Sequence, residues 1–332
     1  MSGLTKIKKI NLPLYGVRLP SFDVSNEVKR SLHLSESLSN EEFLKALSEK
    51  GLQDRGIDSD KYQKRLKYEF DTLKELGFID YILLVWDVIN FCDRSDIPTG
   101  IGRGSAAGSL VLYLIGVTHI DPVKNELFFE RFVSKIRAKK QEVDGITYLD
   151  GSLMCDVDLD ICYYSRQRVL EYLAEKFEGK TSKILTLNTL NTKLLLKECG
   201  KIAGSKTESE MNSVSSLIPK VFGSVKDLEE SYEEVEELKE WCDSNKEVYE
   251  IALKLRGLVK NKGVHPSAVA ISYGKIDESC PLELTSDKSS TVASYDMNWV
   301  SISNVKLDIL GLRSASVVAD ACKQIGINSR EI

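Results

Sequence analysis

Three aspartates alternate with apolar residues in the segment LMCDVDLDICYY, which runs from Leu153 to Tyr164. Successive side chains of a β-strand point to opposite faces. The pattern therefore predicts a strand whose apolar face meets the core and whose other face carries Asp156, Asp158 and Asp160. Carboxylates about 6–7 Å apart on one face repel one another, and a cation between them relieves the repulsion. The segment predicts a divalent-metal site on a sheet.

Two other interpretations compete with this metal site. A calcium-binding EF-hand loop that starts at Asp156 would need glycine at its sixth position and glutamate at its twelfth. Ile161 and Gln167 stand there, so we reject it. The second is a strand face that is simply solvated. Three acids in register, without an interleaved lysine or threonine, favour the metal site over that alternative.

A further aspartate lies in similar surroundings far along the chain. Asp308 is flanked by Leu307 and Ile309 in the segment VKLDILGL. An acid inside an apolar strand is costly unless it is paired or bound to a metal, and a strand-end acid that faces water is the alternative. Two magnesium ions about 3.5–4 Å apart need carboxylates from adjacent strands. We therefore expect Asp308 to lie beside Asp156 and Asp158.

Glycine and serine dominate the segment GIGRGSAAGS, which precedes an apolar run. It formally matches a dinucleotide-binding fingerprint, but the segment before it has a helical pattern, and no lysine follows the glycines as in a Walker motif. Backbone N–H groups of such a turn, with the hydroxyls of Ser105 and Ser109, can surround a phosphate at a helix N-terminus. Arg103 adds a forked positive donor. We favour a phosphate cradle over a turn that serves packing alone.

Further basic residues recur at helical spacing and at the start of a predicted strand. Three lysines four residues apart share one face of a predicted helix, and two lysines and a histidine lie at the entrance of the predicted strand VHPSAVAISYG. They are Lys193, Lys197, Lys201, Lys260, Lys262 and His265. This set is either solvated surface or a contact with a phosphate backbone.

The composition is that of an ordinary globular protein. The 332 residues are 42% hydrophobic and 29% charged, enough for two or three domains. Seven scattered cysteines without a CxxC pair argue against a disulfide framework and against zinc. No signal peptide or membrane span is visible, so we expect a cytoplasmic protein without a membrane partner. The net charge of −5 is concentrated in residues 227–247 and does not decide whether the partner is nucleic acid.

The order of predicted elements indicates a mixed α/β fold. Apolar spacing predicts a helix that begins near Asp60 and ends at Gly77, followed by a buried helix. Residues 134–152 are polar and without periodicity, which predicts an exposed loop. The acidic strand, a further strand and acidic helices over residues 207–260 follow, and then two strands. The pattern predicts a sheet that an all-helical segment interrupts.

In this order the segments resemble the palm and thumb of the bacterial DNA polymerase III alpha subunit, the C family of replicative polymerases. The resemblance covers roughly residues 61–313. It rests on LKELGFIDYILLVWDVINF, GIGRGSAAGSLVLYLIGVTHIDPVKNELFFERF, CDVDLDI, SSLIPK, LVKNKGVHPSAVAI and VKLDILGLR. The sequence departs from the family in Cys155, where the family usually has proline, and in extra residues that include KKQEVDGITYLDG.

The resemblance implies a nucleotidyltransferase-type palm of the α/β (α+β) class with a mixed sheet, interrupted by a helical thumb. The implied domains are a connecting segment at 1–58, palm at 59–189, thumb at 190–262, palm again at 263–316, and the start of the fingers at 317–332. It implies that Asp156, Asp158 and Asp308 are catalytic and hold two Mg²⁺ ions, and that Asp160 is the third acid of the motif.

The resemblance also implies contacts with substrate. Arg103, Gly104 and Ser105 would meet the triphosphate, and Lys306 would lie near the nucleotide or primer end. The thumb would grip duplex DNA along its minor groove. Lys193, Lys197, Lys260, Lys262 and His265 are the expected nucleic-acid contacts.

The implied activity is that of a DNA-directed DNA polymerase, which adds deoxynucleotides to a primer 3′ end. Its partners would be primer–template DNA, deoxynucleoside triphosphates and a second polypeptide with the fingers and clamp-binding regions, for which this sequence has no room. Its location would be the cytoplasm, or the host cytoplasm if a virus encodes it. A non-catalytic polymerase remnant that binds DNA or a replication partner is the alternative, and a stand-alone small nucleotidyltransferase is a third hypothesis.

Overall fold

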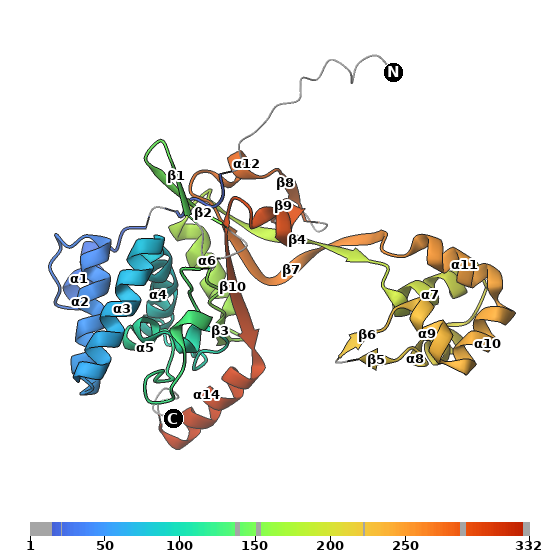
Figure 1. Cartoon of the computed structure of the whole chain (residues 1–332), viewed down its shortest axis with the longest axis horizontal. Helices are drawn as coiled ribbons and strands as arrows, with labels where there is room; N and C mark the ends of the chain where they lie inside the picture. The colour runs from blue at the N-terminus through green and yellow to red at the C-terminus, as the bar shows by residue number, and fades with distance from the viewer. Residues whose placement is uncertain are drawn as a thin grey trace, which may run out of the picture. The chain divides into compact units, whose positions relative to one another are not determined.

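The computed structural model describes residues 15–20, 22–136, 140–150, 154–221, 223–285 and 290–327. The chain divides into two compact units (Figure 1). One comprises Met1–Leu185 and Val264–Ile332, and the other comprises Thr186–Gly263. The first unit combines helices with most of a mixed six-stranded sheet, and the second is mainly helical. The predicted α/β class is confirmed.

Four helices open the first unit. They are α1 (Asn26–Ser31), α2 (Asn40–Arg55), α3 (Asp60–Leu76) and α4 (Ile79–Arg94). A capping box formed by Ser39 and Glu42 starts α2, because each residue bonds the orphan backbone N–H of the other. Gly77 ends α3 in the left-handed conformation (φ 78°), as the sequence predicts.

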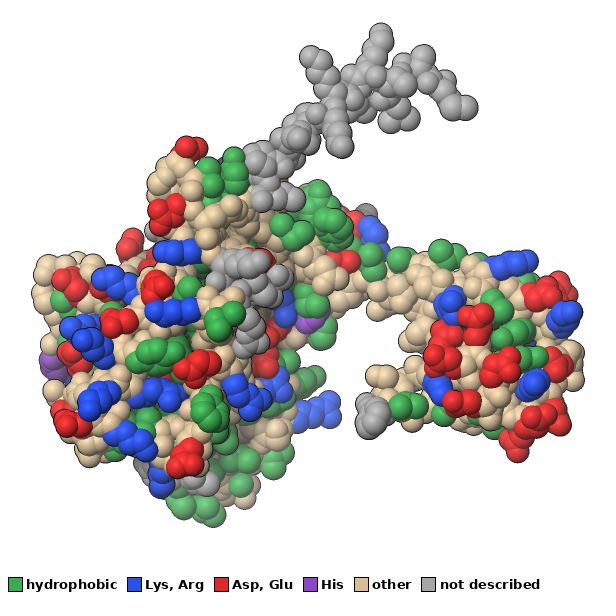
Figure 2. All heavy atoms as spheres, viewed as in Figure 1, with side chains coloured by type: hydrophobic (Ala, Val, Ile, Leu, Met, Phe, Trp, Pro, Cys, Tyr) green, Lys and Arg blue, Asp and Glu red, His purple; other side chains and the backbone are tan. Residues whose placement is uncertain are grey.

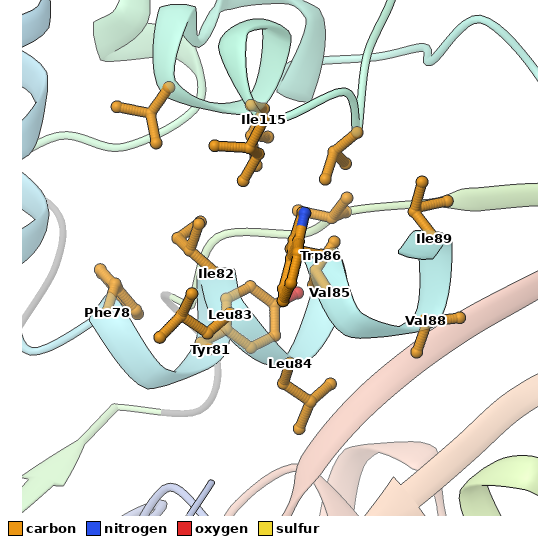
Figure 3. Close-up of a cluster of buried hydrophobic side chains, with 14 of the residues drawn as sticks. Phe78, Tyr81, Ile82, Leu83, Leu84, Val85, Trp86, Val88, Ile89 and Ile115 are labelled. Atoms are coloured by element: carbon orange, nitrogen blue, oxygen red, sulfur yellow. The ribbon is translucent and has the colours of Figure 1, made fainter. Parts of the chain in front are cut away.

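Helix α4 is the centre of the main core. Side chains on several sides of it are buried, including those of Tyr81, Leu83 and Trp86 (Figure 3). A helix that is apolar nearly all round must be covered on all sides. The same core takes in Leu307 and Ile309 of the sheet. Helix α4 therefore packs on the face of the sheet that carries Leu307 and Ile309.

The sheet has the strand order β3-β10-β7-β4-β9-β8. Its strands are β3 (Leu159–Cys162), β4 (Thr181–Thr189), β7 (Val259–Ile271), β8 (Leu282–Leu284), β9 (Thr291–Asp296) and β10 (Val305–Leu312). Strand β10 runs parallel to β3 and antiparallel to β7, and β4 runs parallel to β9. The two acidic segments of the sequence thus belong to neighbouring parts of one sheet.

The two faces of the sheet have different roles. Leu307 and Ile309 join the helix-covered core. Lys306 and Asp308 pair with Ala270 and Ala268, whose side chains belong to a separate small core. Because side chains alternate along a strand, Lys306 and Asp308 point away from the main core. Two short helices, α12 (Ile276–Ser279) and α13 (Met297–Val300), contribute to the small core.

The segment after α4 runs along the free edge of β3. Gly100 donates its backbone N–H to the carbonyl of Asp160 (2.8 Å), and Cys162 donates to the carbonyl of Pro98 (2.9 Å). The 3₁₀-helix η2 (Ala106–Gly108) and helix α5 (Leu110–Leu114) follow, and then the 3₁₀-helix η3 (Phe129–Arg131). The glycine-rich loop is thereby fixed beside the acidic strand.

The exposed loop predicted over residues 134–152 is wrong for residues 140–149, while residues 137–139, 151 and 152 lie outside the described residues. Residues 140–149 contain a hairpin of β1 (Lys140–Val143) and β2 (Ile146–Leu149), and Leu149 also pairs with Val17. Asp144 and Gly145 at its turn both have positive φ (53° and 73°). An Asp-Gly pair favours a two-residue hairpin turn of this kind, so the signal was present in the sequence.

Two longer helices complete the first unit. Helix α6 (Arg166–Lys176) follows β3, and helix α14 (Arg313–Ile325) follows β10. No helix in the described residues is both long and apolar enough to cross a membrane.

The second unit has its own core, formed by residues such as Leu195, Met211 and Leu238. Its helices are α7 (Thr192–Ile202), α8 (Glu208–Ser216), α9 (Leu228–Glu234), α10 (Glu236–Ser244) and α11 (Lys246–Leu255), with a small hairpin of β5 (Lys220–Val221) and β6 (Ser224–Val225). Figure 2 shows many Asp and Glu side chains gathered on this unit. This unit is the helical segment that the sequence predicts between the strands.

Candidate metal centre

Three aspartates from distant parts of the sequence converge at the β3–β10 pair. Asp156, Asp158 and Asp308 each offer a carboxylate oxygen, and these oxygens lie within 4.8 Å of one another. Leu159 pairs with Ile309 in parallel register, so the residues just before them, Asp158 and Asp308, lie side by side. The register of two strands therefore creates the cluster.

The strand that carries the acids is shorter than the sequence predicts. It begins at Leu159, so Asp156 and Asp158 lie in the extended segment before it, and only Asp160 lies within it. The burial pattern nevertheless alternates as predicted: Val157 and Leu159 are buried, whereas Asp156 is exposed and Asp158 is half-buried. The acids thus share a face without the hydrogen bonds of a full strand.

The cluster is electrostatically strained. Desolvation by the surrounding protein raises the pKa of Asp156, and the nearby Lys306 acts against this. The carboxylates of Asp158 and Asp308 raise the pKa further, because like charges disfavour ionisation, and Arg103 lowers it. A bound cation would relieve the same repulsion.

Asp308 has one satisfied and one unsatisfied oxygen. Its Oδ2 accepts a charge-assisted hydrogen bond from Lys306 Nζ at 2.6 Å. Its Oδ1 is buried and has no hydrogen-bond partner among the described residues. Buried polar atoms nearly always have a partner, and an oxygen without one is suited to bind an ion. Three carboxylates and a buried orphan oxygen suit a hard divalent cation such as Mg²⁺, which prefers oxygen ligands.

Arg103 connects the glycine-rich loop to the acids. Its Nε lies 3.3 Å from Asp158 Oδ2 and 3.4 Å from Asp160 Oδ1. Burial raises the pKa of Asp160, and the guanidinium opposes this effect. Gly104 follows in the left-handed conformation (φ 63°) and is exposed, and Ser105 directly precedes η2. Arg103, Gly104 and Ser105 thus lie on the loop nearest to the cluster.

Ser109 does not belong to the expected phosphate cradle. It is fully buried, and its hydroxyl donates to Oε2 of the buried Glu69 at 3.0 Å. Helix α5, which it caps, is only five residues long because Gly116 adopts φ 79°. Sequence reasoning missed Glu69, since an acid on the amphipathic helix α3 gives no sign that it is buried.

Sequence reasoning also missed two features beside the acids. Tyr81 of α4 is buried, and its pKa is raised well above the ordinary value by burial and then by Cys155 and Asp156. A pocket of about 450 Å³ adjoins Asp156 and Lys306, and its polar lining includes Asn298 and Asn304. No sequence pattern marks Tyr81 as a neighbour of the acids, because α4 also carries Trp86 and Phe91.

The predicted nucleic-acid residues lie in both units. In the helical unit, Lys197 contacts Asn212 (2.5 Å), Lys201 contacts Glu208 (2.9 Å), and Lys260 lies 3.1 Å from Glu198; Lys193 and Lys262 belong to the same unit. The stripe on α7 therefore partly serves its packing against α8.

His265 lies in the first unit. Its Nδ1 accepts the backbone N–H of Ala268 at 2.9 Å, which leaves Nε2 as the proton-bearing nitrogen of the neutral ring. Burial lowers the pKa of His265. The ring is therefore a neutral donor at neutral pH.

Gly100 is expected to tolerate no side chain. A Cβ there would lie 2.7 Å from Cβ of Asp160, so Gly100→Ala should push the glycine-rich loop off the strand. Such overpacking costs about 1–3 kcal/mol. Urea unfolding measures the loss, and Gly274→Ala is the control, because its Cβ would meet only the end of the Glu278 side chain. Equal stability of the two variants would contradict the proposed contact.

Carboxylates of two neighbouring chain segments, with an arginine and a lysine beside them, make this a candidate centre for divalent cations and phosphates. Residues 42–311 match the family model of the bacterial DNA polymerase III alpha NTPase domain. The chain belongs to this family.

Relatives named DNA polymerase III subunit alpha support the assignment. The protein of Aquifex aeolicus is 33% identical over 306 residues, covering 82% of this chain and 25% of the relative. That of Pasteurella multocida is 33% identical (87% and 25%), and that of Staphylococcus aureus is 34% identical (82% and 24%). The chain spans about a quarter of the length of the curated relatives it matches.

Proposed function

We propose that the chain provides the catalytic part of a DNA-directed DNA polymerase, which adds deoxynucleotides to a primer 3′ end as the template directs. The observation that carries this proposal is the convergence of Asp156, Asp158 and Asp308 within 4.8 Å in a chain of the polymerase III alpha family. The palm, with the expected limits 59–189 and 263–316, would lie mainly in the first unit.

Asp156, Asp158 and Asp308 would hold two Mg²⁺ ions. The carboxylate donor set and the orphan Oδ1 of Asp308 support this assignment. When bound, such ions would lower the pKa of the primer 3′ hydroxyl and neutralise the departing pyrophosphate. Lys306 orients the Asp308 carboxylate through its 2.6 Å contact, and Asp160 anchors Arg103.

The glycine-rich loop would bind the triphosphate. Arg103 offers a planar fork of donors, and Gly104 and Ser105 offer backbone N–H groups and a hydroxyl. Such donors, held in place before the reaction, stabilise negative charge that develops on the phosphates. Lys306 would lie near the primer end.

The helical unit, with the expected limits 190–262, would be the thumb that holds duplex DNA. Lys193, Lys197, Lys260 and Lys262, with His265 of the palm, would contact the DNA backbone. Lys197 and Lys260, which Asn212 and Glu198 already orient, would still contribute Coulomb attraction to the phosphates. The protein would act in the cytoplasm.

The reaction would also need fingers and clamp-binding regions, which the resemblance to the polymerase family implies. Fingers must close over the incoming base pair, and residues 317–332 would begin them. The rest would be supplied by further residues of the same polypeptide or by a second polypeptide.

Single-nucleotide incorporation tests the proposal. The chain is mixed with Mg²⁺, a labelled primer and each of four templates that differ in the first unpaired base, with and without a polypeptide that carries the remaining regions of an alpha subunit. We expect addition of the complementary nucleotide only. DNA binding without incorporation in either mixture would favour the non-catalytic remnant. Template-independent transfer to a small acceptor would favour a stand-alone nucleotidyltransferase.

A further inference from the structure

We propose that Tyr163, Tyr164, Arg166 and Arg313 form a binding surface for single-stranded DNA, on which an unpaired base stacks. We call these four residues the arginine–tyrosine patch. The choice of DNA as the ligand rests on the proposed function, whereas the stacking site rests on the geometry of the patch.

The two tyrosines are unusually exposed for large aromatic side chains. Tyr164 is 76% exposed and Tyr163 is 48% exposed. Their rings meet edge to face, with centroids 5.6 Å apart and planes at 83°. Exposed aromatic surface that is grouped, rather than scattered singly, commonly marks an interaction site.

Two arginines flank the ring of Tyr163. The guanidinium of Arg313 lies 5.2 Å from its centroid, within the range of a cation–π contact. Arg166 lies beside it: a Cβ built on Gly311 would be 3.0 Å from Cδ of Arg166 and 3.4 Å from Cδ2 of Tyr163. The absence of a side chain at Gly311 therefore lets both side chains pack against β10.

Neither arginine has a carboxylate partner among the residues that the structure describes. Arg166 donates its Nε to the carbonyl of Ile309 at 2.7 Å, which leaves its two terminal nitrogens for a ligand. It is half-buried, and desolvation lowers its pKa. A partly desolvated guanidinium without a counter-ion attracts an anion such as a phosphate.

Three elements hold the patch in place. Tyr163 follows β3, and its backbone N–H donates to Oγ of Ser316 in α14 at 3.0 Å. Arg166 begins α6, and Arg313 begins α14 (Figure 1). Because the side chains project from the ends of regular elements, little ordering entropy is lost when a ligand binds.

This combination suits an unpaired strand better than a duplex. Every nucleobase has a face that can stack on an aromatic ring, and arginine adds cation–π contacts and charge for the backbone. Bases within a duplex already stack on their neighbours, so they offer no free face. The patch begins three residues after Asp160, close in sequence to the metal cluster but without sharing a residue with it.

The test is the fluorescence anisotropy of a labelled oligothymidine in EDTA, with the full chain carrying Asp156→Asn so that no metal-dependent chemistry contributes. We expect Tyr164→Ala to weaken binding about ten-fold, because stacking on one aromatic side chain is lost. Tyr164→Phe should restore it. Tyr295→Ala is the control, since Tyr295 is another exposed tyrosine (44%) with no part in the patch. Arg313→Gln should reduce the salt dependence of the affinity.

Two further probes separate stacking from general attraction. An oligonucleotide with abasic sites should bind the unsubstituted patch about as weakly as oligothymidine binds Tyr164→Ala. A hairpin duplex should bind the Tyr164→Ala variant and the chain with Tyr164 with equal affinity. The proposal is overturned if oligothymidine does not bind, if Tyr164→Ala and Tyr295→Ala bind it equally, or if duplex binding falls as much as single-strand binding. None of these outcomes bears on nucleotide incorporation, which the templated assay measures separately.

Discussion

Asp308→Asn abolishes nucleotide addition if the three aspartates hold the metal ions. The substitution keeps the size of the side chain and removes the charge that one cation needs. Loss of a residue that merely orients a metal ligand costs about 10–100-fold, so loss of a residue that would itself hold the metal should cost more, at least about 1,000-fold. Asp156→Asn should have the same effect. Primer extension with the remaining polymerase regions supplied measures it, and a Mn²⁺ titration should show weakened metal binding.

The matched control for these variants is Asp144→Asn. Asp144 lies at the tip of the β1–β2 hairpin with φ 53°, a conformation that asparagine adopts readily. We expect it to extend primers at the unmodified rate. Duplex binding should be nearly unchanged in all three variants, because the lost groups hold metal rather than DNA. Extension by Asp308→Asn at the rate of Asp144→Asn would refute the assignment of the metal centre.

Glu69→Ala should be among the most destabilising substitutions in the chain. Glu69 is fully buried, and its two oxygens accept bonds from Arg65 Nε (2.5 Å), Ser109 Oγ (3.0 Å) and the N–H of Val111 (3.1 Å). Removing one member of a buried ion pair costs about 3–5 kcal/mol, because the other charge is left uncompensated. Chemical denaturation of the full chain measures the loss.

Glu49→Ala is the control for this prediction. Glu49 lies 4.0 Å from Lys45 on the surface of α2, and such exposed pairs contribute at most about 1 kcal/mol. If burial of the charge determines the loss, Glu69→Ala should lower the free energy of unfolding several-fold more than Glu49→Ala. Equal losses would mean that the network around Arg65 contributes no more than a surface pair.

Residues whose role depends on strand periodicity could be predicted from the sequence. Alternation around Asp156 and around Asp308 identified both acidic segments before their pairing was known, because the period of a strand is local information. That the two segments meet was expected only because two metal ions would need carboxylates from adjacent strands, and the register that places Asp158 beside Asp308 is tertiary information that no local pattern carries. The helical unit could also be predicted, because the 3.6-residue period of its acidic helices is local information.

Features that depend on tertiary contact could not be predicted. Ser109 has the residue type of a phosphate ligand, yet the buried Glu69 takes its hydroxyl. The Glu69 partner Arg65 lies one turn away in α3, but an i,i+4 pair is equally common on exposed helices, and the partners that bury Glu69, Ser109 and Val111, lie 40 or more residues away. The hairpin at Asp144 is a different case. Its Asp-Gly turn is local information that predicts a hairpin, but the polar composition of the segment favours a loop.

The chain leaves the sheet for the helical unit through β4 and returns through β7, and these strands are neighbours in the sheet. An excursion that starts and ends on adjacent strands does not alter the order of the others. A tight turn could join the ends of β4 and β7, and each unit would keep the apolar residues of its own core. Helical modules of different lengths can therefore be exchanged at this position without rebuilding the scaffold that aligns the aspartates.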